Sequence, residues 1–140
     1  MEAKFFLSVI LFVLLQFPVT GQTICGDQQT DVYLPLLKGK KVAVLVNNTS
    51  TVDGRHLVDT LLASGISITA IFAPEHGFRG NADAGEKIVN GTDSKSGLPI
   101  VSLYGKNKKP TSQQLKGIDW VVFDIQDVGV RFYTYISSLH

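Results

Sequence analysis

Cysteine is nearly absent from this sequence, which has one cysteine, one tryptophan and one methionine in 140 residues. A chain whose only cysteine is Cys25 cannot form an internal disulfide. If the chain is exported, a lone cysteine indicates a free thiol, an intermolecular bridge or a lipid attachment site. The residues before it, Gln22-Thr23-Ile24, do not form a convincing lipobox, so we expect no lipid anchor.

An excess of charge is also missing. Thirteen Lys and Arg residues face twelve Asp and Glu residues, for a formal net charge of +1. This balance gives no long-range attraction for polyanions and argues against a nucleic-acid partner. The sequence has no Gly-rich dinucleotide fingerprint after its first apolar strand and no phosphate-binding loop. It also lacks metal-ligand spacing among its histidines and any calcium-loop pattern, so we expect neither cofactor nor metal.

Long hydrophobic runs are limited to one, at the N-terminus. Residues 5–17 are almost wholly apolar, but the run is shorter than the roughly 20 residues that a membrane span needs. Lys4 precedes the run, Pro18 follows it, and residues 19–21 offer small side chains at a cleavage site. We predict a signal peptide at residues 1–21, export to the periplasm or the exterior, and no stable membrane span after cleavage.

The remaining sequence predicts an extension and one folded unit. Residues 22–39 form an N-terminal extension, and residues 40–140 form a domain in which apolar runs alternate with amphipathic segments. Such an alternation predicts an α/β, Rossmann-like fold, with a mostly parallel sheet flanked by helices. Strands are expected at residues 40–48, 66–73, 98–104 and 118–124, helices at 53–64 and from 130 onward, and a capped turn at 111–115. Because residue 140 falls inside the last helix, we expect an incomplete domain.

Polar residues follow three of these predicted strands. Asn47, Glu75 and Asp124 each stand at or just after the end of an apolar run. In open α/β sheets, ligands bind outside the carboxyl ends of the strands, so one edge of the sheet should gather these side chains. The sequence therefore predicts a single polar site.

Glu75 is the first candidate for an acid or base. A carboxyl between a proline and His76 can be partly desolvated, which raises its pKa toward a useful range. The alternative is a loop carboxylate that pairs with Arg79 or His76. His76 itself can position a substrate or donate a proton.

Further candidates lie in two other segments. Glu86, in a glycine-flanked loop, is either a second functional carboxylate or a cap. After the last strand, Gln126, Asp127 and Arg131 can contact hydroxyls, amides or a carboxylate, and Tyr133 can stack on a sugar ring. The alternative for this segment is structural, with Asp127 as a helix N-cap and Arg131 as its ion-pair partner.

Four motifs occur in a fixed order in the chain. They are Pro-Glu-His-Gly-Phe-Arg-Gly at 74–80, Asp-Ala-Gly-Glu at 83–86, Gly-Leu-Pro-Ile-Val-Ser-Leu-Tyr-Gly at 97–105 and Phe-Asp-Ile-Gln-Asp-Val-Gly-Val-Arg-Phe-Tyr-Thr-Tyr at 123–135. Together they resemble the bacterial exo-β-N-acetylmuramidase family, long catalogued as a domain of unknown function. The resemblance runs from about residue 40 to the end of the chain.

The resemblance implies an exo-acting glycoside hydrolase that releases N-acetylmuramic acid from the non-reducing end of peptidoglycan fragments. It also implies a Rossmann-like N-terminal domain, a smaller C-terminal domain and an active-site cleft between them. The family's favoured catalytic glutamate matches Glu75, which would protonate the leaving oxygen. The second role stays open among Glu86, Asp124, Asp127 and the substrate's own acetamido group. Arg131 is expected to hold the lactyl carboxylate.

The candidate residues fall into two groups. The catalytic candidates are Glu75, His76, Glu86 and Asp124, and the substrate-binding candidates are Asn47, Arg79, Gln126, Asp127, Arg131 and Tyr133. On the resemblance we expect these 140 residues to fall short of the family's usual extent and not to include its second domain, which leaves a different class of function open. In that alternative the chain is a non-catalytic muropeptide- or glycan-binding module, or an inactive fragment.

Overall fold

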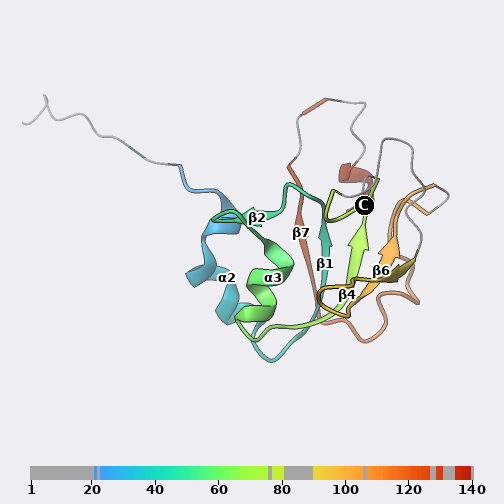
Figure 1. Cartoon of the computed structure of the whole chain (residues 1–140), viewed down its shortest axis with the longest axis horizontal. Coiled ribbons are helices and arrows are strands. Elements are labelled where there is room, and N and C mark those ends of the chain that lie inside the picture. Colours follow the sequence, from blue (N-terminus) through green and yellow to red (C-terminus); the bar gives the residue numbers. More distant parts are fainter. Residues whose placement is uncertain are drawn as a thin grey trace, which may run out of the picture.

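A five-stranded sheet forms the centre of the computed structural model, which describes residues 21, 23–75, 77–80, 90–105, 107–126, 129–130 and 135–139 (Figure 1). The strand order is β5-β6-β4-β1-β7. All neighbours are parallel except β5, which pairs antiparallel with β6. The strands are β1 (Lys41–Val46), β4 (Ser67–Ala73), β5 (Gly91–Thr92), β6 (Pro99–Ser102) and β7 (Trp120–Asp124). The predicted α/β fold with a mostly parallel sheet is confirmed.

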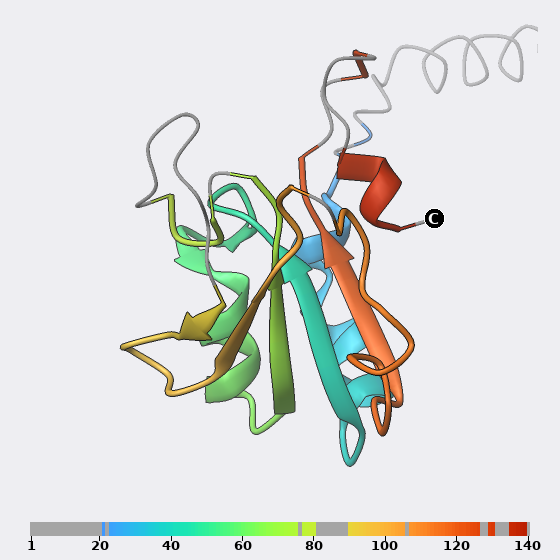
Figure 2. The same cartoon turned by 90° about the vertical axis from the view of Figure 1, so that its right-hand side faces the viewer.

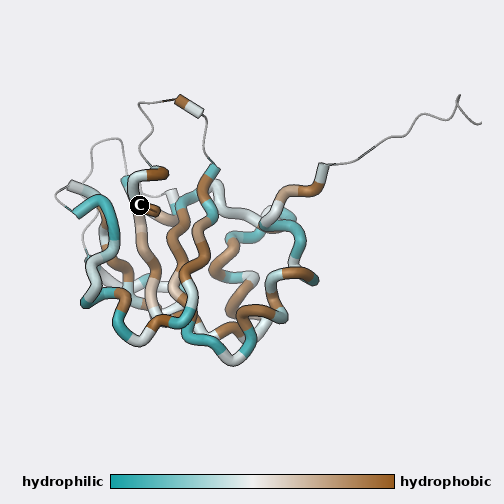
Figure 3. Tube along the Cα trace, turned by 180° about the vertical axis from the view of Figure 1, so that it is seen from behind, coloured by the Kyte–Doolittle hydropathy of each residue, from teal (hydrophilic) through white to brown (hydrophobic). Residues whose placement is uncertain are grey.

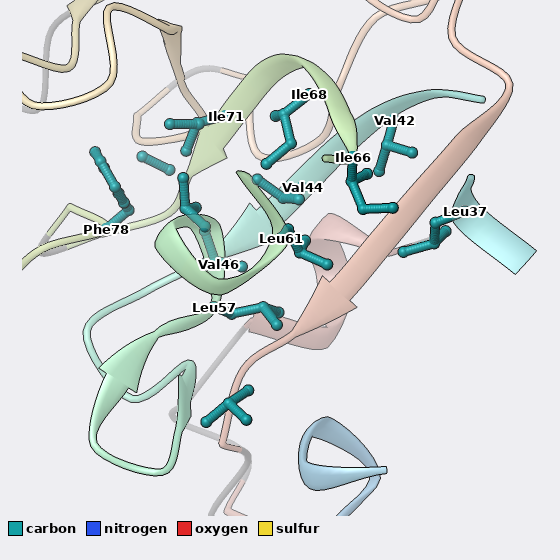
Figure 4. Close-up of a cluster of buried hydrophobic side chains, with 13 residues drawn as sticks. Leu37, Val42, Val44, Val46, Leu57, Leu61, Ile66, Ile68, Ile71 and Phe78 are labelled. Atoms are coloured by element: carbon teal, nitrogen blue, oxygen red, sulfur yellow. The ribbon is translucent and has the colours of Figure 1, made fainter. Parts of the chain in front are cut away.

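Two α-helices cover one face of this sheet (Figure 2). They are α2 (Thr30–Leu37), which follows the 3-10 helix η1 (Gly26–Gln28), and α3 (Leu57–Ala63). In the core cluster, Leu37 of α2 and Leu57 and Leu61 of α3 pack with Val44 and Val46 of β1 (Figure 4). The alternate residues of β1, Ala43 and Leu45, belong to the core cluster of the opposite face. A strand buried on both sides accounts for the continuous apolar run in the sequence.

On the opposite face, loop residues pack against the sheet, and Tyr135 packs against the core cluster of that face. Phe72 of β4 is completely buried there, and Leu103 and Ile125 are buried in the same cluster. The 3-10 helix η2 (Tyr135–Ser138) lies beyond the carboxyl ends of the strands in Figures 1 and 2. Figure 3 shows hydrophobic residues along the strands of the sheet and in the helices, with hydrophilic residues in many of the turns.

The structure corrects the predicted helix at residues 53–64. Asp53 and Gly54 both have positive φ angles, 49° and 76°, and form the turn of a small hairpin between β2 (Thr51–Val52) and β3 (Arg55–His56). Asp-Gly is a preferred pair for such a tight turn. The helix therefore begins at Leu57. Gly65 follows its end at a φ of 75°, as expected for a helix C-cap.

Two further elements add to the prediction, and one predicted turn is confirmed. Helix α2 lies in residues 22–39, where no element was predicted, and β5 was also missed. The predicted turn at 111–115 is confirmed, since Leu115 N donates to Thr111 O over 3.1 Å and Gln114 N to Thr111 Oγ1 over 3.3 Å. None of the described helices is long and apolar enough to cross a bilayer. The predicted signal segment lies outside the described residues except for Gly21.

Candidate active site at the carboxyl edge of the sheet

The loops that follow β1, β4 and β7 meet at one edge of the sheet, here called the carboxyl edge. Strands β4 and β7 both pair with β1, and Val46 at the end of β1 stands in register with Asp124 at the end of β7. Adjacent strands are about 4.8 Å apart, so the ends of β4 and β7 lie roughly 10 Å from each other. The structure thus brings together Asn47, Glu75, Asp124 and Gln126.

The loop after β1 is closed by its own side chains. The Oδ1 atom of Asn47 accepts hydrogen bonds from Thr49 N over 2.9 Å and from Thr49 Oγ1 over 2.6 Å. The backbone N of Asn47 donates to Ser50 Oγ over 3.1 Å, and Asn47 is 3% exposed. These contacts give Asn47 a structural role in its own loop. They do not support the substrate contact predicted from the sequence.

The same loop fixes the exit of β7. Ser50 Oγ donates to the backbone carbonyl of Asp124, and Gln126 N donates to Thr49 Oγ1 over 3.1 Å. Gln126 is exposed at the carboxyl edge, and its contact with a substrate stays a prediction.

Asp124 is the one carboxyl among the described residues whose pKa is raised. Its register with Val46 places it on the helix-covered face of the sheet. Its Oδ2 atom is buried and has no hydrogen-bond partner among the described residues. Burial first, and the charge of Asp27 second, raise the pKa of Asp124 to about 6. A carboxyl with this pKa changes protonation state near neutrality, as acid or base catalysis requires.

A pocket opens beside Asp124, between η1 and α2 on one side and β7 on the other. Its volume is ≈ 720 Å³, and its polar lining includes Asp27, Tyr33, Thr49 and Gln126. The hydroxyl of Tyr33 donates to the backbone carbonyl of Asp27 over 2.7 Å. Burial and the nearby charges of Asp27 and Asp124 raise the pKa of Tyr33, so it stays a neutral donor.

Glu75 lies in the turn that follows β4. Gly77 N donates to Pro74 O over 3.1 Å, and Gly77 has a φ of 73° that suits a glycine. Pro74 is buried, whereas Glu75 is exposed. The prediction that this carboxyl is partly desolvated is therefore wrong, because Glu75 is exposed. The turn instead presents Glu75 to solvent at the carboxyl edge.

Arg79 points into an ion-pair cluster with two acidic residues. Its Nε and Nη2 atoms donate to the two carboxylate oxygens of Asp93 over 2.9 and 2.8 Å. Its Nη1 and Nη2 atoms donate to Asp59 of α3 over 3.2 and 3.1 Å. Lys95 adds a contact to Asp59 over 2.6 Å. This network leaves the predicted substrate-binding role of Arg79 without geometric support.

Charge and hydrogen bonding stabilise the ionised state of this cluster. The side-chain hydrogen bond from Arg79 is the largest cause that lowers the pKa of Asp59, to about 2. Arg79 likewise lowers the pKa of Asp93, and Asp93 raises that of Arg79. The guanidinium carbon of Arg79 also lies 4.7 Å from the ring centre of Phe78. The cluster thus fixes the loop after β4 against α3.

His56 was not predicted as part of the site, yet it joins two of the loops. Its Nε2 atom lies 3.0 Å from Asn47 O and 2.9 Å from Phe78 O. The sequence carries no signal for this role, because both partners are backbone carbonyls of residues far from it in the chain. The candidates His76, Glu86, Asp127, Arg131 and Tyr133 lie outside the described residues.

Comparisons with known proteins assign this chain to a family. The model of the family described as "Exo-beta-N-acetylmuramidase NamZ, N-terminal" matches residues 42–140. The chain belongs to this family. It is 48% identical over 112 residues to the peptidoglycan β-N-acetylmuramidase NamZ of Bacillus subtilis (strain 168), an alignment that covers 76% of this chain and 26% of the relative. The chain therefore spans about a quarter of that relative's length.

Two solved structures of the DUF1343 family, both from Bacteroides fragilis NCTC 9343, share this fold. One is 45% identical with a TM-score of 0.67, and the match covers 84% of this chain and 30% of that one. The other is 39% identical with a TM-score of 0.68, and the match covers 79% and 27%. The resemblance to the bacterial exo-β-N-acetylmuramidase family, inferred from the four motifs, is confirmed.

Proposed function

We propose that this chain is the N-terminal, Rossmann-like part of an exo-acting glycoside hydrolase that releases N-acetylmuramic acid from the non-reducing end of peptidoglycan fragments. The match of the NamZ N-terminal family to residues 42–140 is the observation that carries this proposal. The carboxyl edge supports it, because Glu75 follows β4 and Asp124 ends β7, and these two strands lie on either side of β1.

Glycoside cleavage needs a proton donor for the leaving oxygen and a second group at the anomeric carbon. We assign the donor role to Glu75, which is exposed at the carboxyl edge and matches the family's favoured glutamate. Asp124 is the strongest described candidate for the second role, because its pKa of about 6 lets it act as a base near neutrality. Glu86, Asp127 and the substrate's acetamido group remain alternatives for that role.

The test uses a chimera, since the chain spans only part of its relatives. In the chimera this chain replaces the 112 matched residues of the Bacillus subtilis protein. Release of N-acetylmuramic acid is measured from a muramyl disaccharide and from an aryl β-muramide. Glu75→Gln should abolish turnover of the disaccharide and retain more activity on the aryl substrate, whose leaving group needs less protonation.

Other outcomes assign different roles. An inactive chimera that still binds muropeptide would favour the alternative of a non-catalytic glycan-binding module. An active chimera in which Glu75→Gln has wild-type rates on both substrates would remove Glu75 from catalysis and leave the family assignment intact. Equal losses on the two substrates would exclude a role limited to protonating the leaving group.

Substrate recognition and export are further parts of the proposal. We propose that Arg131 holds the lactyl carboxylate of the muramic acid, so Arg131→Ala should weaken binding of muramic acid more than of N-acetylglucosamine. Equal losses for both sugars would contradict this assignment. We also propose that residues 1–21 direct export and are removed. The N-terminal sequence of the exported protein tests this, because a chain that retains Met1 would contradict cleavage.

A further inference from the structure

His56 contacts three separate segments through one imidazole ring. Its Nδ1 atom accepts a hydrogen bond from Val58 N over 3.2 Å, which makes His56 the N-cap of α3. Its Nε2 atom faces the carbonyl oxygens of Asn47 and Phe78. The ring also packs edge-on against Phe78, with ring centres 5.4 Å apart and planes at 83°. One side chain thus connects the start of α3 with the loops after β1 and β4.

The partners of the ring determine its tautomer. A backbone N–H can only donate, so Nδ1 must carry a lone pair and accept from Val58 N. Two carbonyl oxygens can only accept, so Nε2 must carry the proton and donate to Asn47 and Phe78. These contacts are satisfied together by the neutral Nε2–H form. A ring with protons on both nitrogens would leave the N–H of Val58 without its acceptor.

The loop after β4 is also held at two positions next to Phe78. Arg79 pairs with Asp59 of α3, one turn from the N-cap. Gly80, with a φ of 70°, lies so close to the loop after β1 that an added Cβ would be 3.0 Å from Asn48 Cβ. Among the described residues, His56 is the side chain that contacts all three segments. In the loop after β4, its partner is the carbonyl of Phe78, which lies three residues after Glu75 in the chain.

We propose that His56 is a positioning residue that, as its Nε2–H tautomer, holds the Glu75 turn against the loop after β1. This orients Glu75 relative to the exit of β7, because the loop after β1 also bonds Asp124 O and Gln126 N. The catalytic meaning of this contact depends on the proposed glycosidase function. The contact itself does not depend on that function.

Two substitutions separate the two functions of the ring. Asparagine is among the best N-cap residues but is too short to reach the far carbonyls, so His56→Asn should keep the cap and lose the connection between loops. Glutamine is longer and keeps an N–H donor, but it is a weaker N-cap. His56→Gln should therefore keep more of the contact between the loops and lose part of the helix cap. Comparing these two variants therefore separates loss of the contact between the loops from a general loss of folding.

NMR of the 140-residue chain supplies the structural test. Imidazole ¹⁵N shifts should show the Nε2–H tautomer at pH 7.5, and backbone order parameters for residues 77–80 should match those of the strands. In His56→Asn the order parameters of residues 77–80 should fall below about 0.6, a flexible value, while those of α3 stay near about 0.85. An Nδ1–H or doubly protonated ring, or unchanged order parameters in the Asn variant, would overturn the proposal.

Kinetics in the Bacillus subtilis chimera test the positioning role. His56→Asn should lower kcat about tenfold or more with a small change in KM, and His56→Gln should recover part of the loss. Equal kcat values for the wild type and His56→Asn, with the loop mobile by NMR, would remove the positioning role. An inactive wild-type chimera would contradict the proposed function, whereas the contact between loops would still be decided by NMR.

Discussion

Burial raises the pKa of Asp124, whereas ion pairing lowers the pKa of Asp59 and of Asp93. For Asp124, the folded pKa of about 6 lies above the ordinary value of 3.8. A raised carboxyl pKa means that folding disfavours the ionised form. The free energy of unfolding should therefore fall as the pH rises from about 4 through 6, and then stay level.

Asp124→Asn should remove this pH dependence. The variant is expected to be more stable than the wild type at pH 7.5, by at most about 3 kcal/mol, and to show little gain at pH 4. Urea unfolding at both pH values measures the effect. Asp53→Asn is the matched control, because Asp53 is exposed in a tight turn that asparagine also tolerates, and it should change stability by less than about 0.5 kcal/mol. A uniform loss of stability in Asp124→Asn would contradict the pH argument.

The cluster of Arg79, Asp59 and Asp93 has the opposite effect on acid stability. The side chains of Asp59 and Asp93 are 8% and 4% exposed, and that of Arg79 is 20% exposed. Because Arg79 lowers the pKa of both carboxyls, their contribution is complete above about pH 4 and is lost as the pH falls toward 2.

Removing the cation should leave two nearly buried carboxylates without their main partner. Arg79→Ala is expected to lower the free energy of unfolding by about 3 kcal/mol at pH 7. Lys95→Ala should cost no more than about 1 kcal/mol, because the Lys95 side chain is 64% exposed. Chemical denaturation of the two variants compares them directly, and similar small losses would show that Arg79 is dispensable to the loop.

At the level of elements, the sequence predicted the strands better than the helices. The runs that became β1, β4 and β7 are apolar on both sides of the strand, a pattern that parallel sheets require. The start of α3 was placed too early because the Asp53-Gly54 turn signal was not recognised. Helix α2 was missed because it follows a polar segment and contains Pro35, a residue that usually interrupts a helix.

The candidate site was predictable in position but not in its contacts. The ends of neighbouring parallel strands must share an edge, so Glu75, Asp124 and Gln126 were placed there correctly. The partners of Arg79 and His56 come from segments 9 to 22 residues away, and no local pattern specifies them. A hydrogen-bonding side chain beside a motif can serve either the ligand or the loop, and its tertiary partners decide which.

The loop after β4 makes a close approach that tests this packing. Gly80 and Gly65 both have positive φ angles, 70° and 75°, but only Gly80 has a neighbour within 4 Å of an added Cβ. Gly65→Ala should lower the free energy of unfolding by about 1–2 kcal/mol, because alanine is strained in this backbone conformation. Gly80→Ala should lower the free energy of unfolding by more, because the added Cβ also meets Asn48. Urea unfolding measures the loss of stability, and the amide shifts of residues 47–50 report the change at Asn48. Equal costs would show that the loops can separate without penalty.

At the scale of the whole described structure, β7 has the apolar sequence of a central strand but lies at the edge of the sheet. Residues 120–123 of this strand are apolar on both faces, as in a central strand, yet Trp120 is 46% exposed and Val121 41% exposed. Among the described residues, β7 pairs with β1 alone. Strand β1, by contrast, has a neighbour on each side and is buried from Val42 to Val46.

This asymmetry predicts the order of amide protection in the 140-residue chain. The amides of residues 42–46 in β1 should exchange only through global unfolding, because these residues are buried and have a strand on each side. Alternate amides of β7 point away from β1 and should exchange within the dead time of the experiment, since an edge strand leaves them to solvent. Hydrogen exchange followed by NMR at several protein concentrations measures both. Slow exchange of the outward β7 amides at every concentration would show that another part of the chain covers this edge. Slow exchange only at high concentration would show that a second copy covers it, since self-association depends on mass action.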